Sequence, residues 1–490
     1  MRHALLTLSL VACAAASPAT AAPEATPPAV NVLFIAIDDL GNVLGPRRPA
    51  GLQTPNLERL AARGVFFERA YCQIPLCNPS RASVLTGRRP DAIGVYDLDR
   101  HFRDALPEVV TLPQWFRQHG ARVERVGKIY HYDVPKGIGT DGLDDPPSWD
   151  AVANPKGRDV TDEALITNPL PDRPISAAMS WLAADGGDDE QTDGLIARDA
   201  VKRLQRLAQP GQPPFFLAAG FFRPHTPYVA PKAYFDAQPL DGVQLTQVPE
   251  EDASDIPAAA IPHNIPVPDY GHPPEILRQA LQAYLASVRF VDAQVGVLLQ
   301  TMDELDLWPT TVVVLWSDHG YHLGEHHLWQ KRTLFDESSR APLIIVAPQI
   351  PAAARGQTCH RVVEFIDIYP TLASLAGIPP AAPLPGHDLR PLLQDPQAAW
   401  PHPAFTQILR PFDPQVMGRA ITTERWRYIE WNGGEAGSEL YDHLHDPREL
   451  TNLANDPQRA DLIQRLRAQF ADRARATPPP PSVPVHPHRL

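Results

Sequence analysis

The stretch Val32-Leu33-Phe34-Ile35-Ala36-Ile37-Asp38-Asp39 is an apolar run that stops at two adjacent carboxylates. A short run that is apolar at every position is typical of a strand buried on both faces of a parallel sheet. Four further runs predict strands, at Ala121–Val126, Pro214–Ala219, Thr311–Trp316 and Pro342–Val346. Because helical patterns separate these runs, the sequence predicts an α/β fold with a central mixed, largely parallel sheet flanked by helices.

Two helical patterns and one irregular stretch complete this part of the chain. Thr54 is predicted to cap a helix that has Pro55 at its first position. Another helix is predicted over Leu277–Met302, where apolar residues recur three and four apart, which indicates core packing rather than a cofactor site. The Pro-rich stretch Ala230–Pro274 shows little periodicity, and we expect an ordered surface excursion that walls the functional site.

The pattern changes near residue 396. Short strand patterns at Ala404–Leu409, Arg419–Thr423 and Tyr428–Trp431 precede a helical pattern over Pro457–Ala471. We therefore predict a main domain over residues 31–395 and a smaller C-terminal α+β subdomain over residues 396–476. The Pro-rich tail, residues 477–490, is expected to be disordered.

Composition excludes several classes of protein. The 490 residues carry 57 acidic and 44 basic side chains, a net charge of −13, so no nucleic-acid partner is expected. An apolar content of 43% is too high for a wholly disordered chain. Four cysteines are too few for a disulfide scaffold.

The N-terminus has the features of an export signal. Ala4–Ala16 is apolar but too short to span a bilayer, and Ala19-Thr20-Ala21 offers a cleavage site, so residues 1–22 are predicted to be a signal peptide. Alternatively, Leu10-Val11-Ala12-Cys13 resembles a bacterial lipobox, which would make a lipid on Cys13 the single membrane attachment. With a signal peptide over residues 1–22, residues 23–30 would be a linker; with a lipid on Cys13, the Ala/Pro-rich stretch Ala14–Val30 would be a tether. We expect an exported protein, periplasmic, lipid-anchored or secreted.

An odd number of cysteines remains after this leader: Cys72, Cys77 and Cys359. In an exported protein, at least one of these thiols must be unpaired in the monomer or modified. Whether Cys72 and Cys359 pair with each other stays open.

Polar groups follow four of the predicted strands at their carboxyl ends. They are Asp38 and Asp39, Lys128 and His131, His225, and Asp318 and His319. Because ligands bind at the carboxyl ends of parallel strands, we expect these side chains to meet at one edge of the sheet. Three carboxylates suit a hard cation such as Ca²⁺ or Mg²⁺, and the imidazole also admits Mn²⁺. The sequence thus predicts a metal site with Lys128, His131 and His225 around a substrate.

A further landmark is Cys77-Asn78-Pro79-Ser80-Arg81, followed by Leu85-Thr86-Gly87-Arg88. A cysteine near an arginine, at a turn that opens a helix, is a candidate activated nucleophile, with a buried structural cysteine as the alternative. These residues resemble the sulfatase signature Cys-x-Pro-Ser-Arg with its trailing Leu-Thr-Gly-Arg. The resemblance extends over nearly the whole chain, including the strand that ends at Asp38-Asp39, Ser317–Gly320 and Arg425–Trp431.

Within the sulfatases the chain most resembles the iduronate-2-sulfatases, through Gly127-Lys128-Ile129-Tyr130-His131, Pro224-His225-Thr226-Pro227 and the Asp318-His319 pair. Choline sulfatases share several of these features. The resemblance implies an alkaline-phosphatase-like fold and removal of O-sulfate from a sulfated saccharide. A choline-sulfatase-like activity on a small molecule and a phosphate or phosphonate ester hydrolase on the same scaffold are the alternative enzymes. An inactive protein that binds sulfated glycans is the alternative from another class.

The resemblance also implies roles for individual residues. Cys77 would be oxidised by a formylglycine-generating maturation enzyme, and the hydrated aldehyde would be the nucleophile. The implied cation ligands are Asp38, Asp39, Asp318, His319 and the modified Cys77. By the same resemblance, Arg81 would hold the formylglycine, and Lys128 and Lys331 would bind sulfate oxygens. His225 would protonate the leaving alcohol, and Asp318 and His131 would accept protons.

Substrate specificity is expected to come from loops. Tyr321 lies in one such segment and is predicted to contact the substrate. Arg103, in the loop Tyr96–Arg103, is considered as a partner for a substrate carboxylate, with an ordinary surface arginine as the alternative.

Overall fold

The computed structural model describes residues 30–265, 267–380, 382–411 and 415–476. Its main feature is an eight-stranded sheet in the order β12-β2-β11-β8-β1-β6-β3-β4. The strands are β1 (Asn31–Ile37), β2 (Val65–Tyr71), β3 (Arg122–Gly127), β4 (Ala151–Ala153), β6 (Phe215–Phe221), β8 (Thr311–Ser317), β11 (Leu343–Val346) and β12 (Gln357–Glu364). Strand β11 runs antiparallel to β2 and β8, and the other neighbours pair in parallel. The predicted mixed, largely parallel sheet is confirmed.

The sheet is buried on both faces. Along β1, Leu33, Ile35 and Ile37 belong to one apolar core, whereas Val32 and Phe34 belong to a second core on the opposite face. This two-sided burial explains why the strand is apolar at every position. All five predicted strands lie in this sheet, while β2, β4 and β12 were not predicted.

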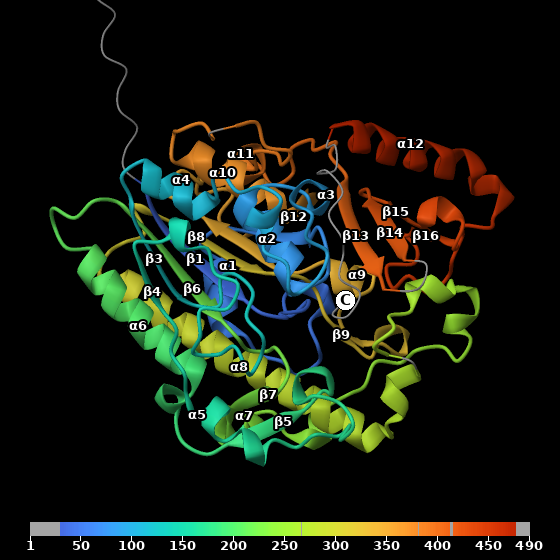
Figure 1. The fold of residues 1–490 in the computed structure, drawn as a ribbon, viewed down its shortest axis with the longest axis horizontal. Helices are drawn as coiled ribbons and strands as arrows, with labels where there is room; N and C mark the ends of the chain where they lie inside the picture. The colour runs from blue at the N-terminus through green and yellow to red at the C-terminus, as the bar shows by residue number, and fades with distance from the viewer. Residues whose placement is uncertain (1–29, 266, 381, 412–414, 477–490) are drawn as a thin grey trace, which may run out of the picture.

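Helices cover both faces of the sheet (Figure 1). One core includes residues of α1 (Pro55–Ala61), α6 (Thr192–Leu207) and α8 (Pro274–Glu304), and the other includes residues of α2 (Cys77–Thr86), α4 (Leu112–Gln118), α10 (Ile368–Leu375) and α11 (Arg390–Gln394). The remaining short helices are α3 (Pro90–Ile93), α5 (Arg158–Thr161), α7 (Lys232–Asp236) and α9 (Asp336–Ser339). Helix α8 confirms the helix predicted from its apolar spacing.

Thr54 is the N-cap residue of α1 and Pro55 its first residue, as predicted, but the expected capping bond is absent. The Thr54 side chain makes no capping hydrogen bond. Instead, Oδ1 of Asp292, from α8, accepts hydrogen bonds from the backbone N–H groups of Leu57 at 2.8 Å and Asn56 at 3.1 Å. A carboxylate is a stronger acceptor than a hydroxyl for free N–H groups at a helix N-terminus, so packing of α8 against α1 replaces the local cap.

A separate antiparallel sheet lies beside the main one (Figure 1). It contains β13 (Ala404–Arg410), β14 (Val416–Thr422), β15 (Trp426–Trp431) and β16 (Ser438–Asp442), in that order. Helix α12 (Ala460–Ala476) packs on this sheet through a small core of Ile421, Tyr428, Leu440 and Leu466. The three strands and the helix predicted here correspond to β13, β14, β15 and α12, and β16 is an additional strand.

The stretch from Ala230 to Pro274 is ordered by its contacts. It contains α7 and several single 3₁₀ turns and follows β7 (Tyr228–Pro231), which pairs with β5 (Trp181–Ala184). Oδ2 of Asp252 lies 2.9 Å from Nδ1 of His326, and Asp269 binds both His327 and Trp329. The excursion therefore packs against the segment that contains β9 (His322–Leu323) and β10 (Trp329–Gln330).

The predicted signal peptide with Cys13, most of the linker 23–30 and the tail 477–490 lie outside the described residues. Across the part of the chain that the structure describes, no helix combines the length and the apolar character that a bilayer-spanning segment needs.

Candidate active site

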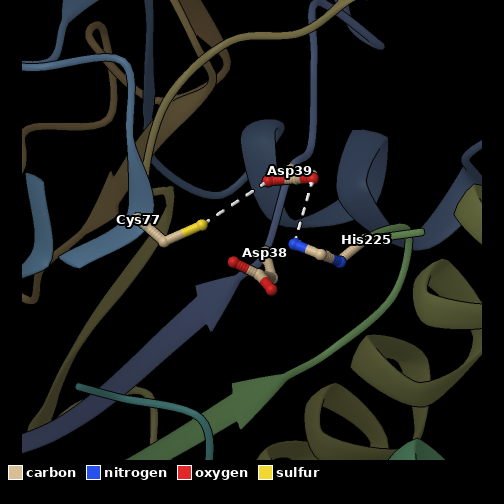
Figure 2. Close-up of side chains that lie close together, drawn as sticks. All are labelled: Asp38, Asp39, Cys77 and His225. Atoms are coloured by element: carbon tan, nitrogen blue, oxygen red, sulfur yellow. Dashed lines mark hydrogen bonds and ion pairs between the residues drawn. The ribbon is translucent and has the colours of Figure 1, made fainter. Parts of the chain in front are cut away.

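The predicted site residues come together at the carboxyl edge of the sheet. Asp38 and Asp39 directly follow β1, whose last residue Ile37 pairs in register with Ser317 of β8 and Phe221 of β6. The carboxyl ends of these three neighbouring strands are therefore aligned, and the polar residues that follow them lie at the same edge of the sheet. Figure 2 shows the result for Asp38, Asp39 and His225, which converge with Cys77.

Cys77 lies at the same edge because it follows the carboxyl end of β2, a strand that the sequence did not predict. It begins α2 and is 1% exposed. Its Sγ lies 3.2 Å from Nζ of Lys331, 3.5 Å from Nε2 of His319 and 3.9 Å from Oδ1 of Asp39. The sulfur is thus surrounded by a cation, an imidazole and a carboxylate, at a helix N-terminus that favours negative charge.

Two cations hold the carboxylates of this site in place. Arg81 donates from Nη2 to Asp38 and from Nε to Asp318, both at 2.9 Å, and from Nη1 to the carbonyl oxygens of Lys128 and Ile129. Nζ of Lys128 lies 2.6 Å from Oδ2 of Asp38. Burial opposes ionisation of Asp38, but the charges of Lys128 and Arg81 outweigh it and hold its pKa well below the usual value.

Asp39 is the carboxylate of the site that has one oxygen without a hydrogen bond. Its backbone has φ 59°, in the left-handed region, and its Oδ2 is buried without a hydrogen-bond partner among the described residues. Oδ1 lies 2.5 Å from Nζ of Lys331 and 3.3 Å from Nε2 of His319. Burial raises the pKa of Asp39 to about 7, against the opposing effect of Lys331. Oδ2 lies 3.7 Å from Nε2 of His225, too far for a hydrogen bond (Figure 2). A strained backbone and a buried oxygen without a hydrogen bond are features of a ligand-binding position.

Two imidazoles present Nε2 to the site. Nδ1 of His319 donates to the carbonyl of Gly320 at 2.9 Å, and Nδ1 of His225 donates to the carbonyl of Thr226 at 2.5 Å. These bonds place a proton on Nδ1 of both rings, because a carbonyl oxygen only accepts. Burial disfavours charge on His319, but Asp318 and Cys77 raise its pKa to about 9, whereas burial and Lys331 place the pKa of His225 well below its ordinary value.

His131 lines a cavity beside the site. It is 5% exposed, and neither ring nitrogen has a hydrogen-bond partner within the described part of the chain. Burial lowers its pKa to about 4, so the ring is neutral at neutral pH. The cavity has a volume of about 270 Å³ and is also lined by Leu98, Asp99, Lys136 and Thr140. The loop Tyr96–Arg103, expected to contribute to specificity, thus reaches this cavity.

Lys331 lies in a segment that has several positive φ angles. His326, His327, Gln330 and Arg332 all have positive φ, between 54° and 80°. Residues other than glycine are strained at positive φ, so contacts with other parts of the protein must stabilise this segment. Asp252 and Asp269 of the 230–274 excursion supply these contacts. Sequence reasoning missed them because they join positions far apart in the chain.

The donor set fits a divalent cation. Two overlapping groups of possible ligand atoms, Asp38/Asp39/Cys77/His225 and Asp39/Cys77/Asp318/His319, each lie within 4.8 Å of one another. Carboxylates are the most numerous of these candidate ligands, and hard cations prefer their oxygens. A cation here would be coordinated by Oδ2 of Asp39, which has no hydrogen bond to a described residue. A third group, Asp336/His443/Glu449, is instead engaged by Arg47, Arg340 and Arg427.

The structure gives Arg103 and Tyr321 partners within the protein, and their contact with substrate stays a prediction. Arg103 forms an ion pair with Asp145 and donates to the carbonyl oxygens of Pro107 and Val109. Tyr321 is 2% exposed, shares a 2.7 Å hydrogen bond with the hydroxyl of Tyr228 and stacks on Tyr284. The guanidinium and the phenol are therefore satisfied within the protein.

Comparisons with known proteins agree with this fold and site. A family model described as Sulfatase matches residues 30–378, and one described as N-sulphoglucosamine sulphohydrolase, C-terminal, matches residues 324–476. A sulfatase of Formosa agariphila is 31% identical, with 89% of this chain and 85% of that protein covered. Human iduronate 2-sulfatase is also 31% identical, with 94% and 98% covered. The crystal structure of a phosphonate monoester hydrolase of Agrobacterium radiobacter superposes with a TM-score of 0.75 at 22% identity, covering 91% of this chain and 95% of that one.

The fold and the site define a hydrolase of the alkaline-phosphatase-like architecture. The chain belongs to the sulfatase family. It is a sulfuric ester hydrolase with iduronate 2-sulfatases among its relatives.

Proposed function

We propose that this protein removes an O-sulfate group from a sulfated saccharide, as an iduronate-2-sulfatase-like enzyme. The observation that carries the proposal is the position of Cys77, whose Sγ lies 3.2 Å from Lys331 and 3.5 Å from His319 at the edge where Asp38 and Asp39 meet. The human relative that covers nearly the whole chain is named for iduronate 2-sulfate, which supports a uronate-containing substrate.

The site requires two groups that we assign from the family. A divalent cation, Ca²⁺ with Mg²⁺ or Mn²⁺ as alternatives, would be held by Asp38, Asp39, Asp318, His319 and the modified Cys77, and it would polarise the sulfate oxygens. Formylglycine, made from Cys77 by a maturation enzyme, would supply a hydroxyl nucleophile from its hydrated aldehyde. Export, with a signal peptide or a lipid on Cys13, is part of the proposal because sulfated polysaccharides are extracellular substrates.

The chain's own residues would handle charge and protons. Nζ of Lys128 and Lys331 would bind sulfate oxygens as negative charge shifts towards the leaving oxygen. His225, whose Nδ1–H is held by the carbonyl of Thr226, would take up a second proton at Nε2 when the anionic substrate binds, and it would then give this proton to the leaving alcohol with the help of Lys331. Asp318 would accept the proton of the attacking hydroxyl, and Arg81 would hold its carboxylate in place. His131, neutral at pH 7, would accept the proton that releases sulfate.

Sulfate release from defined sulfated oligosaccharides, measured for the wild type and for Cys77→Ala, tests this function. We expect release from a 2-O-sulfated uronate and none above background from the variant. Aryl sulfate and aryl phosphonate, compared side by side, separate the proposal from the alternative ester chemistry on this scaffold. Faster turnover of the phosphonate, or full activity of Cys77→Ala, would contradict it.

A further inference from the structure

Arg332 lacks the hydrogen bonds and ion pairs that the fully buried arginines make. It is half-buried, yet its guanidinium has no hydrogen bond or ion pair to any residue that the structure describes. Other buried arginines all have partners: Arg81 binds Asp38 and Asp318, Arg125 binds Asp144, Arg223 binds Asp159, and Arg427 binds Ser339 and the carbonyl of Leu334. A charge withdrawn from water without a partner is costly, so a ligand is the expected partner.

The position of Arg332 places it beside the reaction centre. It directly follows Lys331, whose Nζ lies 3.2 Å from Sγ of Cys77. Burial lowers the pKa of Arg332, and the charges that oppose this are those of Cys77 first and Tyr270 second. The guanidinium is therefore within interaction range of Cys77, and conversion of this thiol to formylglycine would remove the charge that opposes it there.

The backbone at Arg332 is held in a strained conformation. Its φ is 80°, in the left-handed region, and its carbonyl oxygen accepts a hydrogen bond from Nη1 of Arg410. Arg410 is itself 1% exposed and donates to the carbonyl oxygens of Ala259 and Ala260. One arginine of β13 therefore joins the 230–274 excursion to Arg332. Strain that several elements maintain together is typical of a position that contacts a ligand.

The reacting sulfate already has its own cations, Lys128 and Lys331. A planar guanidinium with free donors matches a second anionic group with two or three oxygens, which it can bind through paired hydrogen bonds. We propose that Arg332 binds a second anionic group of the substrate, a carboxylate or a further sulfate, next to the sulfate ester that is hydrolysed. This inference rests on the proposed sulfatase function and assigns to Arg332 the part that the sequence considered for Arg103.

The test compares three substrates: a disaccharide that carries a uronate carboxylate and two sulfates, the same compound with the carboxyl reduced to an alcohol, and the same compound with the carboxylate but only the sulfate that is hydrolysed. The measured quantity is kcat/KM for the wild type, Arg332→Gln, Arg332→Lys and the exposed control Arg355→Gln. We expect the wild type and the control to prefer the intact substrate by about 10- to 100-fold, as for a hydrogen-bonded charge. Arg332→Gln should lose this preference, and Arg332→Lys should retain part of it.

The outcomes separate the two sources of the anion. Sensitivity to carboxyl reduction assigns Arg332 to a carboxylate, and sensitivity to loss of the second sulfate assigns it to that sulfate. An equal preference in the wild type and in Arg332→Gln, with unchanged thermal stability, overturns the inference. Aryl sulfate, which has one anionic group, reports on the proposed function itself: if the wild type hydrolyses it but shows no preference among the disaccharides, this inference alone fails, and if the wild type releases no sulfate from any substrate, both fail.

Discussion

Nε of Arg81 lies 2.9 Å from Oδ2 of Asp318, and neither side chain is exposed. The same guanidinium binds Asp38 at 2.9 Å, so one arginine fixes the spacing of two carboxylates from different strands. Both acids are candidate cation ligands, and Arg81 is the fifth residue of α2, the helix that begins at Cys77. Arg81 therefore holds the carboxylates of Asp38 and Asp318 at a fixed spacing.

Replacing Arg81 by Ala should therefore affect stability as well as activity. Two buried carboxylates would lose their partner, which costs about 3–5 kcal/mol for a broken buried ion pair. The urea midpoint of unfolding should fall, and Arg355→Ala, an exposed arginine, serves as the matched control. An unchanged midpoint for Arg81→Ala would contradict the structural role.

Replacing Lys331 by Met should lower kcat rather than only raise KM. Its Nζ contacts both Asp39 and Cys77, where charge changes during sulfate transfer. Loss of one such donor reduces kcat by about 10²–10³-fold. Steady-state kinetics with an aryl sulfate measure this, with Lys232→Met, an exposed lysine, as the control. A change confined to KM would show that Lys331 binds substrate without stabilising the transition state.

Substituting Gly220 by Ala tests how closely strands β3 and β6 approach behind Lys128. A Cβ at Gly220 would lie 2.0 Å from the carbonyl oxygen of Lys128, so the backbone that carries this lysine must move. We expect a loss of about 1–3 kcal/mol of stability and lower activity. Gly242→Ala, where a Cβ meets nothing within 4 Å, should be neutral. Equal melting temperatures and activities for the two variants would contradict this packing.

The ion pair between Asp252 and His326 predicts a pH dependence of stability. Burial opposes protonation of His326, but the Asp252 carboxylate at 2.9 Å and the nearby charges of Glu337 and Glu449 raise its pKa. A raised folded-state pKa gives stability that is present below the unfolded pKa of about 6.5 and is lost as pH rises through the folded value. Asp252→Asn should therefore lower the urea midpoint more at pH 6 than at pH 9. A difference independent of pH would contradict the charge on His326.

The sequence predicts the sheet and much of the site because both are encoded locally. The apolar run before Asp38 and the run before Asp318 each place a carboxylate at a strand end, and parallel neighbours bring strand ends together. Strand β2 escaped prediction because Glu68 and Arg69 interrupt its apolar pattern. The roles of individual site residues remain predictions, although the structure brings Cys77, Lys331 and the three aspartates together.

What the sequence could not predict depends on contacts between distant residues. The carboxylate that caps α1 comes from Asp292, more than two hundred residues away. The ion pair of Arg103 with Asp145 joins two loops, and the positive φ of Arg332 is imposed by surrounding elements rather than by its residue type. Such features carry no local signal, and one of them underlies the inference about a second anionic group.

The proposed mechanism depends on oxidation of Cys77 to formylglycine. Mass spectrometry of the peptide containing Cys77, from an active preparation made in the native host, tests it most directly. The account predicts an aldehyde in place of the thiol, in a fraction that rises with specific activity across preparations. A fully active preparation in which Cys77 is present only as the unmodified thiol would contradict it.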